Sequence, residues 1–156
     1  VYFVPAFSGI MAPRWRDDAR GTIVGLTRFA NRNHIARAAL EATAYQTREV
    51  AEAMRKQADI QLKTVKVDGA MTENKLLMQF QADMLNCPVV RGGLRENAAL
   101  GAAYAAGLAV HFWSSTDEIR ANWIPNDMWR PTMKENTREE LFHNWNKAVE
   151  RSLDWA

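Results

Sequence analysis

Apolar side chains recur at helical spacing through residues 34–54 and charged residues occupy the other faces, so this pattern predicts a long amphipathic helix. Asn31 or Asn33 is placed to cap its N-terminus, because an asparagine side chain can accept a hydrogen bond from a free backbone N–H group. A second helix is predicted from a cap at Thr72 to about Leu85, again with one apolar side. Both patterns indicate helices that pack against a core.

Two more helices are predicted in the second half of the chain. Residues 97–110 are rich in glycine and alanine, and Gly101 and Ala105 stand one turn apart, so another backbone could approach this helix closely. Before the last helix, Thr137 and Glu140 fit a capping box, in which each side chain accepts a hydrogen bond from the other residue's backbone N–H. The apolar stripe that follows marks its buried side: Leu141, Phe142, Trp145, Val149 and Leu153.

Short β-rich segments alternate with these helices. Residues 1–7 and 21–26 are predicted to pair as two strands of a hairpin. Residues 62–67 and 88–90 are predicted strands with a helix between them, and a further helix follows the second strand. This order indicates βαβ units, in which the two strands are parallel.

A weaker pattern covers residues 114–134, which are predicted to be either extended and packed by Trp123 and Trp129 or loose. The sequence contains no internal repeat and no low-complexity linker, so residues 1–156 are expected to form one α/β domain. The chain opens without methionine and without a signal-peptide pattern, which predicts that it is a piece of a longer protein.

The composition is that of a globular protein, with 47% hydrophobic and 24% charged residues. No apolar run reaches the roughly 18 residues that a membrane-spanning helix needs, so no membrane partner is expected. The 20 basic and 18 acidic residues are interleaved, so a nucleic-acid partner is not expected either. A single cysteine, Cys87, excludes an internal disulfide and is typical of a reducing compartment, which predicts a cytoplasmic location.

Several chemistries lack the residues that they need. There is no P-loop motif, and His34, His111 and His143 are scattered without a second ligand type beside them, so no metal site is expected. Cys87 has no histidine near it in sequence and is expected to be a buried, inert thiol. The six tryptophans are more typical of packing than of nucleic-acid stacking. No catalytic residue is assigned in this chain.

One turn is a candidate site. A predicted strand ends at Asp68-Gly69, and Asn74 lies in the first turn of the helix that follows. Ligands of α/β proteins bind outside the carboxyl ends of strands. Free backbone N–H groups and the positive end of a helix dipole suit a nucleotide phosphate or ribose. Most turns of this kind bind no ligand, so this motif indicates a binding site only when further motifs in the sequence support it.

Several short motifs together resemble the FGGY family of carbohydrate kinases, and within it the glycerol kinases. They are FVPAFSG at 3–9, ARG at 19–21, GTIVGL at 21–26, HIARAALE at 34–41, DG at 68–69, NKLLMQ at 74–79 and AALGAA at 98–103. GTIVGL and HIARAALE are separated by seven residues and together match the second signature of this family. The last motif is similar to a small-residue helix near the family's interdomain contact. The resemblance covers essentially the whole chain.

The resemblance implies that the chain is the C-terminal domain of a two-domain enzyme with an actin-like ATPase (ribonuclease H-like) fold, a mixed sheet flanked by helices. Such an enzyme transfers the γ-phosphoryl group of ATP to an alcohol group, here of glycerol, with Mg²⁺. The family's general base and main phosphate-binding turns lie in segments that would precede Val1, so the partner is an N-terminal kinase domain. The resemblance also implies a homo-oligomer, and it assigns nucleotide binding to Gly69, Ala70 and Asn74.

Two positions depart from the family pattern. Ala70 stands where the family has the second glycine of its turn, and a methyl group there would cost about 1 kcal/mol if the position required a positive φ. The methyl group would also crowd a nucleotide, so weaker ATP binding is expected. Arg14 stands where tyrosine is usual, and because it lies in a predicted loop the change is expected to alter only surface packing.

Two alternatives remain open at this point. One is another FGGY kinase, acting on a pentose, a pentonate or another polyol, although the motifs at 3–9 and 74–79 favour glycerol. The other is a non-catalytic binding domain of a degraded kinase relative. Ala70 and the lack of a recognisable catalytic half support this second alternative.

Overall fold

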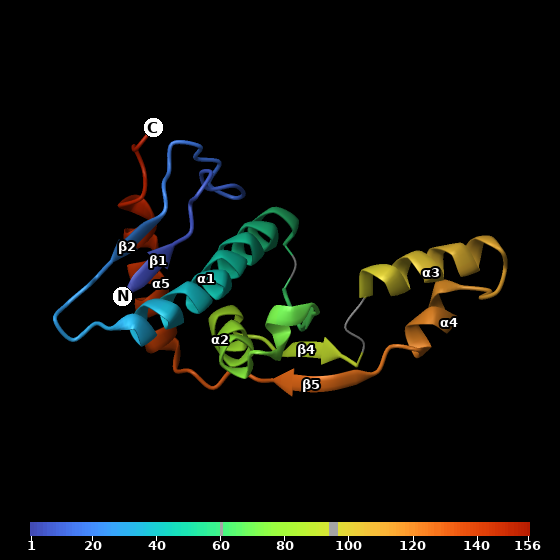
Figure 1. The fold of residues 1–156 in the computed structure, drawn as a ribbon. Coiled ribbons are helices and arrows are strands. Elements are labelled where there is room, and N and C mark those ends of the chain that lie inside the picture. The colour runs from blue at the N-terminus through green and yellow to red at the C-terminus, as the bar shows by residue number, and fades with distance from the viewer. Residues whose placement is uncertain (60, 94–96) are drawn as a thin grey trace.

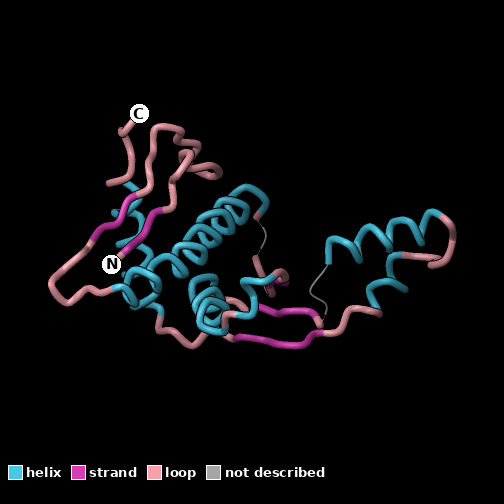
Figure 2. The backbone as a smooth tube through the Cα atoms, viewed as in Figure 1, coloured by secondary structure: helices cyan, strands magenta, loops and turns pink. Residues whose placement is uncertain are grey.

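The computed structural model describes residues 1–59, 61–93 and 97–156. Figures 1 and 2 show two small sheets separated by a layer of helices, with one pair of helices extending to one side. One sheet is two-stranded and the other is three-stranded. The arrangement is mixed α/β, as the sequence predicted.

The N-terminal hairpin and the long helix after it are confirmed. Strands β1 (Tyr2–Val4) and β2 (Thr22–Val24) pair antiparallel. Helix α1 (Arg32–Ala58) is longer at both ends than predicted and is capped by Asn31, whose Oδ1 accepts a hydrogen bond from the backbone N–H of Asn33 at 3.0 Å. His34 completes this cap, because its Nδ1 accepts a hydrogen bond from the backbone N–H of Asn31.

The second sheet has the order β3-β4-β5 and contains both strand orientations. Strands β3 (Val65–Val67) and β4 (Val89–Gly92) are parallel, with helix α2 (Lys75–Leu85) as the crossover between them, so the predicted βαβ unit is confirmed. Strand β5 (Pro125–Trp129) pairs antiparallel to β4 and makes the sheet mixed.

The interpretation of residues 114–134 as an extended segment packed by tryptophans is only partly right. The segment contains the short helix α4 (Thr116–Ala121) and strand β5. Trp123 lies under the ammonium group of Lys66 at 3.7 Å from the ring centroid, and Trp129 is partly buried against the core. Strand β5 was missed because it has a proline and polar residues where a buried strand would have apolar ones, and β4 supplies its hydrogen-bond partners.

Two predicted helix caps are wrong. Asn74, not Thr72, caps α2, because the chain makes an additional 3-10 turn, η1 (Ala70–Glu73), before the helix begins. Helix α5 (Glu135–Glu150) begins after Lys134, so the Thr137–Glu140 capping box does not form, and both residues lie inside the helix.

A tertiary contact explains why α5 begins earlier. The buried carboxylate of Asp83 in α2 accepts hydrogen bonds from the backbone N–H groups of Thr132 and Met133 at 2.6 and 3.0 Å. These bonds fix the chain as it enters α5. A contact over about 50 residues of sequence leaves no local signal, and the capping box was only a local pattern.

The core lies where α1, α2, α5 and β1 meet. The ring of Tyr45 in α1 stacks on that of Trp145 in α5, with centroids 5.1 Å apart, and meets the edge of Phe80 in α2 at 5.3 Å. Trp145 and Tyr45 are each 1% exposed. Aromatic side chains of this size bury large apolar areas, so the three rings join the three helices into one unit.

Arg14 does more than alter the surface. Its guanidinium donates from Nε to Oε1 of Glu49 in α1 at 2.7 Å, and from Nη2 to Oδ1 of Asn146 in α5 at 2.5 Å. Glu49 is buried, so the ion pair satisfies a carboxylate inside the protein. The expectation that this position affects only surface packing is therefore wrong.

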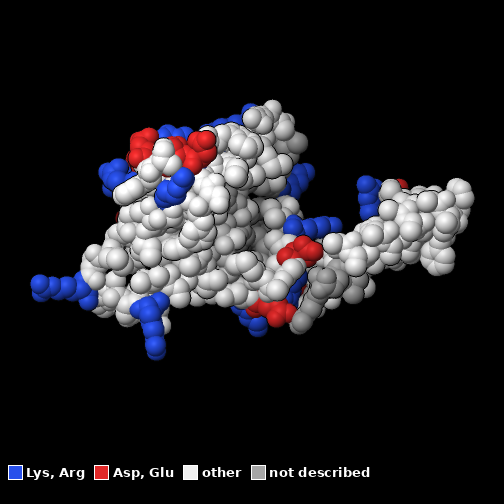
Figure 3. Space-filling view, turned by 45° about the horizontal axis from the view of Figure 1, so that its top comes forward, with Lys and Arg blue, Asp and Glu red and all other residues white. Residues whose placement is uncertain are grey.

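Helices α3 (Asn97–Ala109) and α4 extend away from the core (Figure 1). Tyr104 of α3 contacts Trp113 with ring centroids 5.0 Å apart. The exposed small side chains of α3 are Ala98, Ala99, Ala102, Ala103, Ala105, Ala106 and Ala109. In the face shown in Figure 3 this part is largely uncharged, and the acidic and basic side chains of the main body lie in scattered groups, mostly near its edges. The predicted close-approach face of this helix is thus open.

None of the described helices is long and apolar enough to cross a membrane.

We expect Trp145→Ala to lower the free energy of unfolding by about 3–5 kcal/mol, because it leaves a cavity between α1 and α5. The matched control is Trp155→Ala, which removes an indole that is 66% exposed and should cost less than about 1 kcal/mol. Urea unfolding followed by circular dichroism measures both. Equal losses in the two variants would show that the aromatic stack does not hold the helices together.

Candidate functional site

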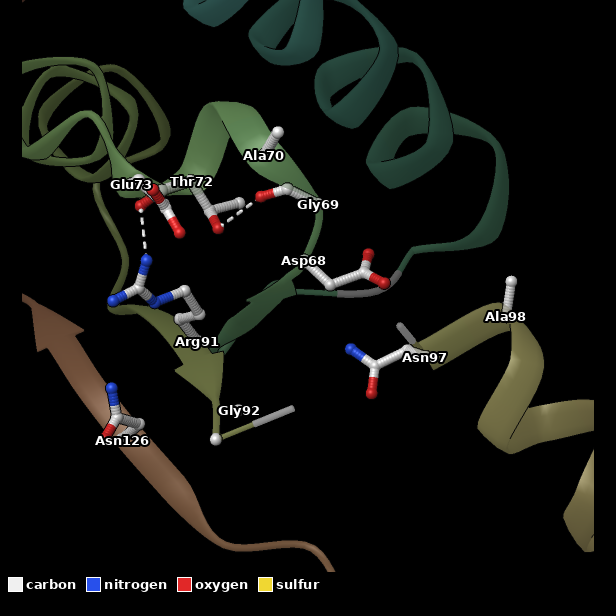
Figure 4. Close-up of a pocket in the computed structure, with 11 residues that line it drawn as sticks. Asp68, Gly69, Ala70, Thr72, Glu73, Arg91, Gly92, Asn97, Ala98 and Asn126 are labelled. Atoms are coloured by element: carbon white, nitrogen blue, oxygen red, sulfur yellow. Dashed lines mark hydrogen bonds between the residues drawn. The ribbon is translucent and has the colours of Figure 1, made fainter. Parts of the chain in front are cut away.

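A pocket of about 590 Å³ opens at the carboxyl ends of β3 and β4 (Figure 4). The turn after β3 contributes Asp68, Gly69 and Ala70, and the end of β4 contributes Arg91 and Gly92. The pocket is completed from α3 and β5, by Asn97, Ala98 and Asn126 among others. The pocket therefore lies where ligands of α/β proteins bind, outside the carboxyl ends of parallel strands.

The turn after β3 depends on Gly69. Its φ of 89° and ψ of 170° belong to a region of backbone conformation that only glycine adopts without strain. A Cβ atom built on Gly69 would meet no atom within 4 Å, so the space beside it is open. The turn is closed by Thr72, whose backbone N–H and Oγ1 both donate to the carbonyl oxygen of Gly69, at 3.1 and 2.7 Å.

Ala70 has no positive φ, so the condition under which its methyl group would cost about 1 kcal/mol is not met. The positive φ belongs to Gly69, and Ala70 begins the 3-10 helix η1. Ala70 is exposed and lines the pocket. Replacing Ala70 by glycine would therefore relieve no backbone strain, and only the expectation that its methyl group crowds a nucleotide stays a prediction.

Asn74 has a structural task of its own. Its Oδ1 accepts a hydrogen bond from the backbone N–H of Leu77 at 3.1 Å and so caps α2. Gly69 and Ala70 line the pocket, whereas Asn74 does not. It directly follows Glu73, which is the last residue of η1 and does line the pocket. Its assignment as a nucleotide contact stays a prediction, and any such contact would use the other side of its amide, the Nδ2 donor.

Sequence reasoning missed Arg91, Asn97 and Asn126. Asn126 lies on β5, a strand that was not predicted, and Asn97 opens a helix noted only for its small residues. A signal for Arg91 was present, because it directly follows the predicted strand at 88–90 and precedes Gly92-Gly93, just as Asp68 directly follows the predicted strand at 62–67. The rule that points to Asp68-Gly69 applies equally to Arg91.

The lining of the pocket suits the base and ribose of a nucleotide better than its phosphates. The amides of Asn97 and Asn126 offer both donors and acceptors, and the carboxylate of Asp68 can accept hydrogen bonds from hydroxyl groups. That carboxylate would repel phosphate groups, and Arg91 pairs with Asp127. The described residues contain no group of three or more histidine, cysteine, aspartate and glutamate side chains that could hold a metal ion.

Cys87 lies outside this pocket and is buried between α2 and β4, as predicted. Burial raises the pKa of its thiol, because a thiolate is poorly solvated there. The thiol is therefore protonated at neutral pH, which agrees with the expectation of an inert cysteine.

The chain is similar to known carbohydrate kinases along its whole length. A model of the C-terminal domain of the FGGY family of carbohydrate kinases matches residues 1–110. Glycerol kinase of Azorhizobium caulinodans is 64% identical over 156 residues, which are 100% of this chain and 31% of that protein. Glycerol kinase of Chloroflexus aurantiacus is 61% identical with the same coverage. The chain thus spans about a third of the length of these relatives.

Solved structures give the same result. The structure of Plasmodium falciparum glycerol kinase with ADP has a TM-score of 0.87 and 41% identity, covering 97% of this chain and 30% of that chain. Xylulose kinase of Lactobacillus acidophilus has a TM-score of 0.83 and 25% identity, covering 96% and 31%. The expected fold class, a mixed sheet flanked by helices in an actin-like ATPase arrangement, is confirmed.

We expect Gly69→Ala to destabilise the turn by about 1–3 kcal/mol, because alanine strains the backbone at this φ and ψ. The matched control is Gly101→Ala in α3, where a Cβ also meets nothing within 4 Å but the backbone is helical. That change should be neutral or stabilise by about 0.4–1 kcal/mol.

Hydrogen exchange at the backbone amide of Thr72, which bonds to Gly69, reports on this turn directly. Exchange should be faster in Gly69→Ala than in wild type and unchanged in Gly101→Ala. Unchanged exchange in Gly69→Ala would show that the turn accepts a side chain.

Proposed function

The chain belongs to the FGGY family of carbohydrate kinases, and we propose that it forms the nucleotide-binding C-terminal domain of an ATP-dependent glycerol kinase. The observation that carries this proposal is the similarity over the whole chain to glycerol kinases. Identity to the solved glycerol kinase is 41%, against 25% to the xylulose and gluconate kinases of Lactobacillus acidophilus. The substrate proposed is therefore glycerol, and another polyol is the alternative that the assay below tests.

Residues 1–156 are proposed to act as one domain, although the family model matches only residues 1–110. Two elements beyond that match support this extension. Strand β5 completes the sheet that carries the pocket, and α5 supplies Trp145 to the core. Neither element could be removed without exposing the other parts of the domain.

In the proposed reaction, a hydroxyl oxygen of glycerol attacks the γ-phosphorus of ATP. The bond from that phosphorus to the oxygen shared with the β-phosphate breaks, ADP leaves, and the hydroxyl proton passes to a general base. Positioning and stabilisation of charge supply most of the acceleration in phosphoryl transfer. The general base, the glycerol contacts and the phosphate-binding groups are proposed to lie in an N-terminal domain.

This chain's part in that reaction is to hold the adenosine end of ATP. Gly69 and Ala70 bring the backbone of the turn to the nucleotide without a large side chain, and Asn74 is proposed to donate from Nδ2. Mg²⁺, which neutralises phosphate charge in such reactions, is proposed to be held by the phosphates and by the N-terminal domain. The open face of α3 is proposed to contact that domain, because its small side chains allow a close approach.

One of the two supports for the alternative of a non-catalytic domain is weakened. That alternative rested partly on Ala70 as a damaging departure from the family pattern. The backbone at Ala70 is unstrained, which removes backbone strain from this argument and leaves only crowding of a nucleotide. The homo-oligomer and the cytoplasmic location stay predictions.

The proposed function is tested by a coupled assay of ADP release in the full-length protein, with glycerol, xylulose and gluconate as substrates. We expect turnover that depends on glycerol and is far slower with the other two. The fragment 1–156 alone should show none, because half of a cleft cannot align glycerol with ATP. Faster turnover with xylulose or gluconate would favour the alternative substrate class, and no turnover with any of them would favour a non-catalytic domain.

Asn74→Ser should raise the KM for ATP about tenfold, as expected for loss of one hydrogen bond to the nucleotide. Serine keeps an oxygen that can cap α2 but has no amide donor, so the thermal stability should change little. The KM for glycerol should stay the same, since the polyol site lies elsewhere. Asn74→Ala is the companion variant, which removes both the cap and the donor. An unchanged ATP KM in Asn74→Ser would show that Asn74 serves only as a cap.

A further inference from the structure

We infer that Arg91 is a positioning residue for ATP and acts without contacting the nucleotide. Its guanidinium holds the turn at Gly69 in place through a hydrogen bond to Thr72. This inference rests on the proposed function and assigns a role within the same site. Two contacts are involved: the ion pair of Arg91 in β4 with Asp127 in β5, and the hydrogen bond of Arg91 to the carbonyl group of Thr72 in η1.

The ion pair orients the guanidinium of Arg91. Arg91 and Asp127 are direct partners in the antiparallel register of β4 and β5. Oδ2 of Asp127 accepts hydrogen bonds from Nε of Arg91 at 3.1 Å and also from Nη2. Two donors on one edge of a planar group fix that plane, so the remaining nitrogen is held in one direction.

The remaining nitrogen, Nη1, donates a hydrogen bond to the turn that begins at Gly69. It donates to the carbonyl oxygen of Thr72 at 3.2 Å, the contact drawn beside η1 in Figure 4. Thr72 is 5% exposed and in turn makes both hydrogen bonds to the carbonyl of Gly69. A continuous set of bonds therefore runs from Asp127 through Arg91 and Thr72 to Gly69.

Gly69 needs such an external support. It has no side chain to pack, the space beside it is open, and Asp68 and Ala70 on either side of it are exposed. Packing within the turn therefore does little to define its position, and the hydrogen bonds made by Thr72 take on that role. A displaced turn would misplace the backbone that faces the nucleotide, and small displacements of binding groups reduce affinity strongly.

The contribution of Arg91 to overall stability should be small. Its side chain is 24% exposed and that of Asp127 is 35% exposed, so water screens the ion pair. A purely structural role would change stability and every kinetic constant together. A positioning role predicts that these properties change separately. The binding of ATP weakens, whereas the binding of glycerol and the stability of the protein stay the same.

Kinetics of the full-length enzyme test this inference. We expect Arg91→Met to raise the KM for ATP about tenfold, equivalent to about 1.4 kcal/mol, with the KM for glycerol and the Tm nearly unchanged. Arg91→Lys should lie between Arg91→Met and wild type, since an ammonium group can reach one partner but lacks the planar fork. The matched control is Arg120→Met, which breaks an exposed ion pair with Asp117 in α4 and should change neither KM.

Asp127→Asn tests the orienting step separately. It should raise the ATP KM less than Arg91→Met does. The double variant should be no worse than Arg91→Met alone, because both changes act through the same guanidinium. Additive effects would contradict the proposed chain of contacts, as would an Arg91→Met enzyme with the ATP KM of wild type, or one whose Tm and both KM values deteriorate together.

These outcomes are distinct from failure of the proposed function. A wild-type protein that does not phosphorylate glycerol would contradict that function, and the role of Arg91 would then be decided by titration with ADP. Weaker binding of ADP in Arg91→Met than in Arg120→Met would support it. Equal binding in the two variants, or no binding of ADP by the wild type, would overturn it.

Discussion

The candidate site depends on a backbone conformation at Gly69 that only a residue without a side chain adopts readily. The same property that makes the turn possible also leaves it without packing of its own. Its shape is therefore set by hydrogen bonds from Thr72, and its position by the contact of Thr72 with Arg91. The sheet and the turn that line the pocket are therefore connected by hydrogen bonds. Strand β5 contributes to this connection because it carries Asp127, the ion-pair partner that orients Arg91.

The sheet in turn depends on the helical layer behind it. Helix α2 connects β3 to β4 and contributes Phe80 to the aromatic cluster that joins α1 and α5. It also contributes Asp83, which fixes the chain between β5 and α5. Helix α2 thus contacts the strands, the aromatic core and the segment between β5 and α5. Stability of the core and geometry of the pocket are therefore coupled through α2.

Patterns that are local in sequence were predictable, and those that depend on distant partners were not. The hairpin, α1, α2 and the parallel β3–β4 pair follow from apolar periodicity. Strand β5 and the start of α5 are set by β4 and by Asp83, and their own sequences do not show it. In the site, Gly69 was found because a strand ended in a turn signal. Whether Ala70 needed a positive φ could not be read from the sequence, and the structure places that φ at Gly69.

The charges of the pocket support the proposal that a second domain binds the phosphates of the nucleotide. The carboxylate of Asp68 suits the hydroxyl groups of a ribose but opposes a triphosphate, and Arg91 is already paired with Asp127. A pocket of this kind can orient a nucleotide by one end and leaves its reactive end to groups outside the chain. The exposed alanine face of α3 offers a surface on which such groups could be brought close. If the nucleotide is divided between two domains, as proposed, closure of the cleft between them would be a condition for alignment of the reacting atoms.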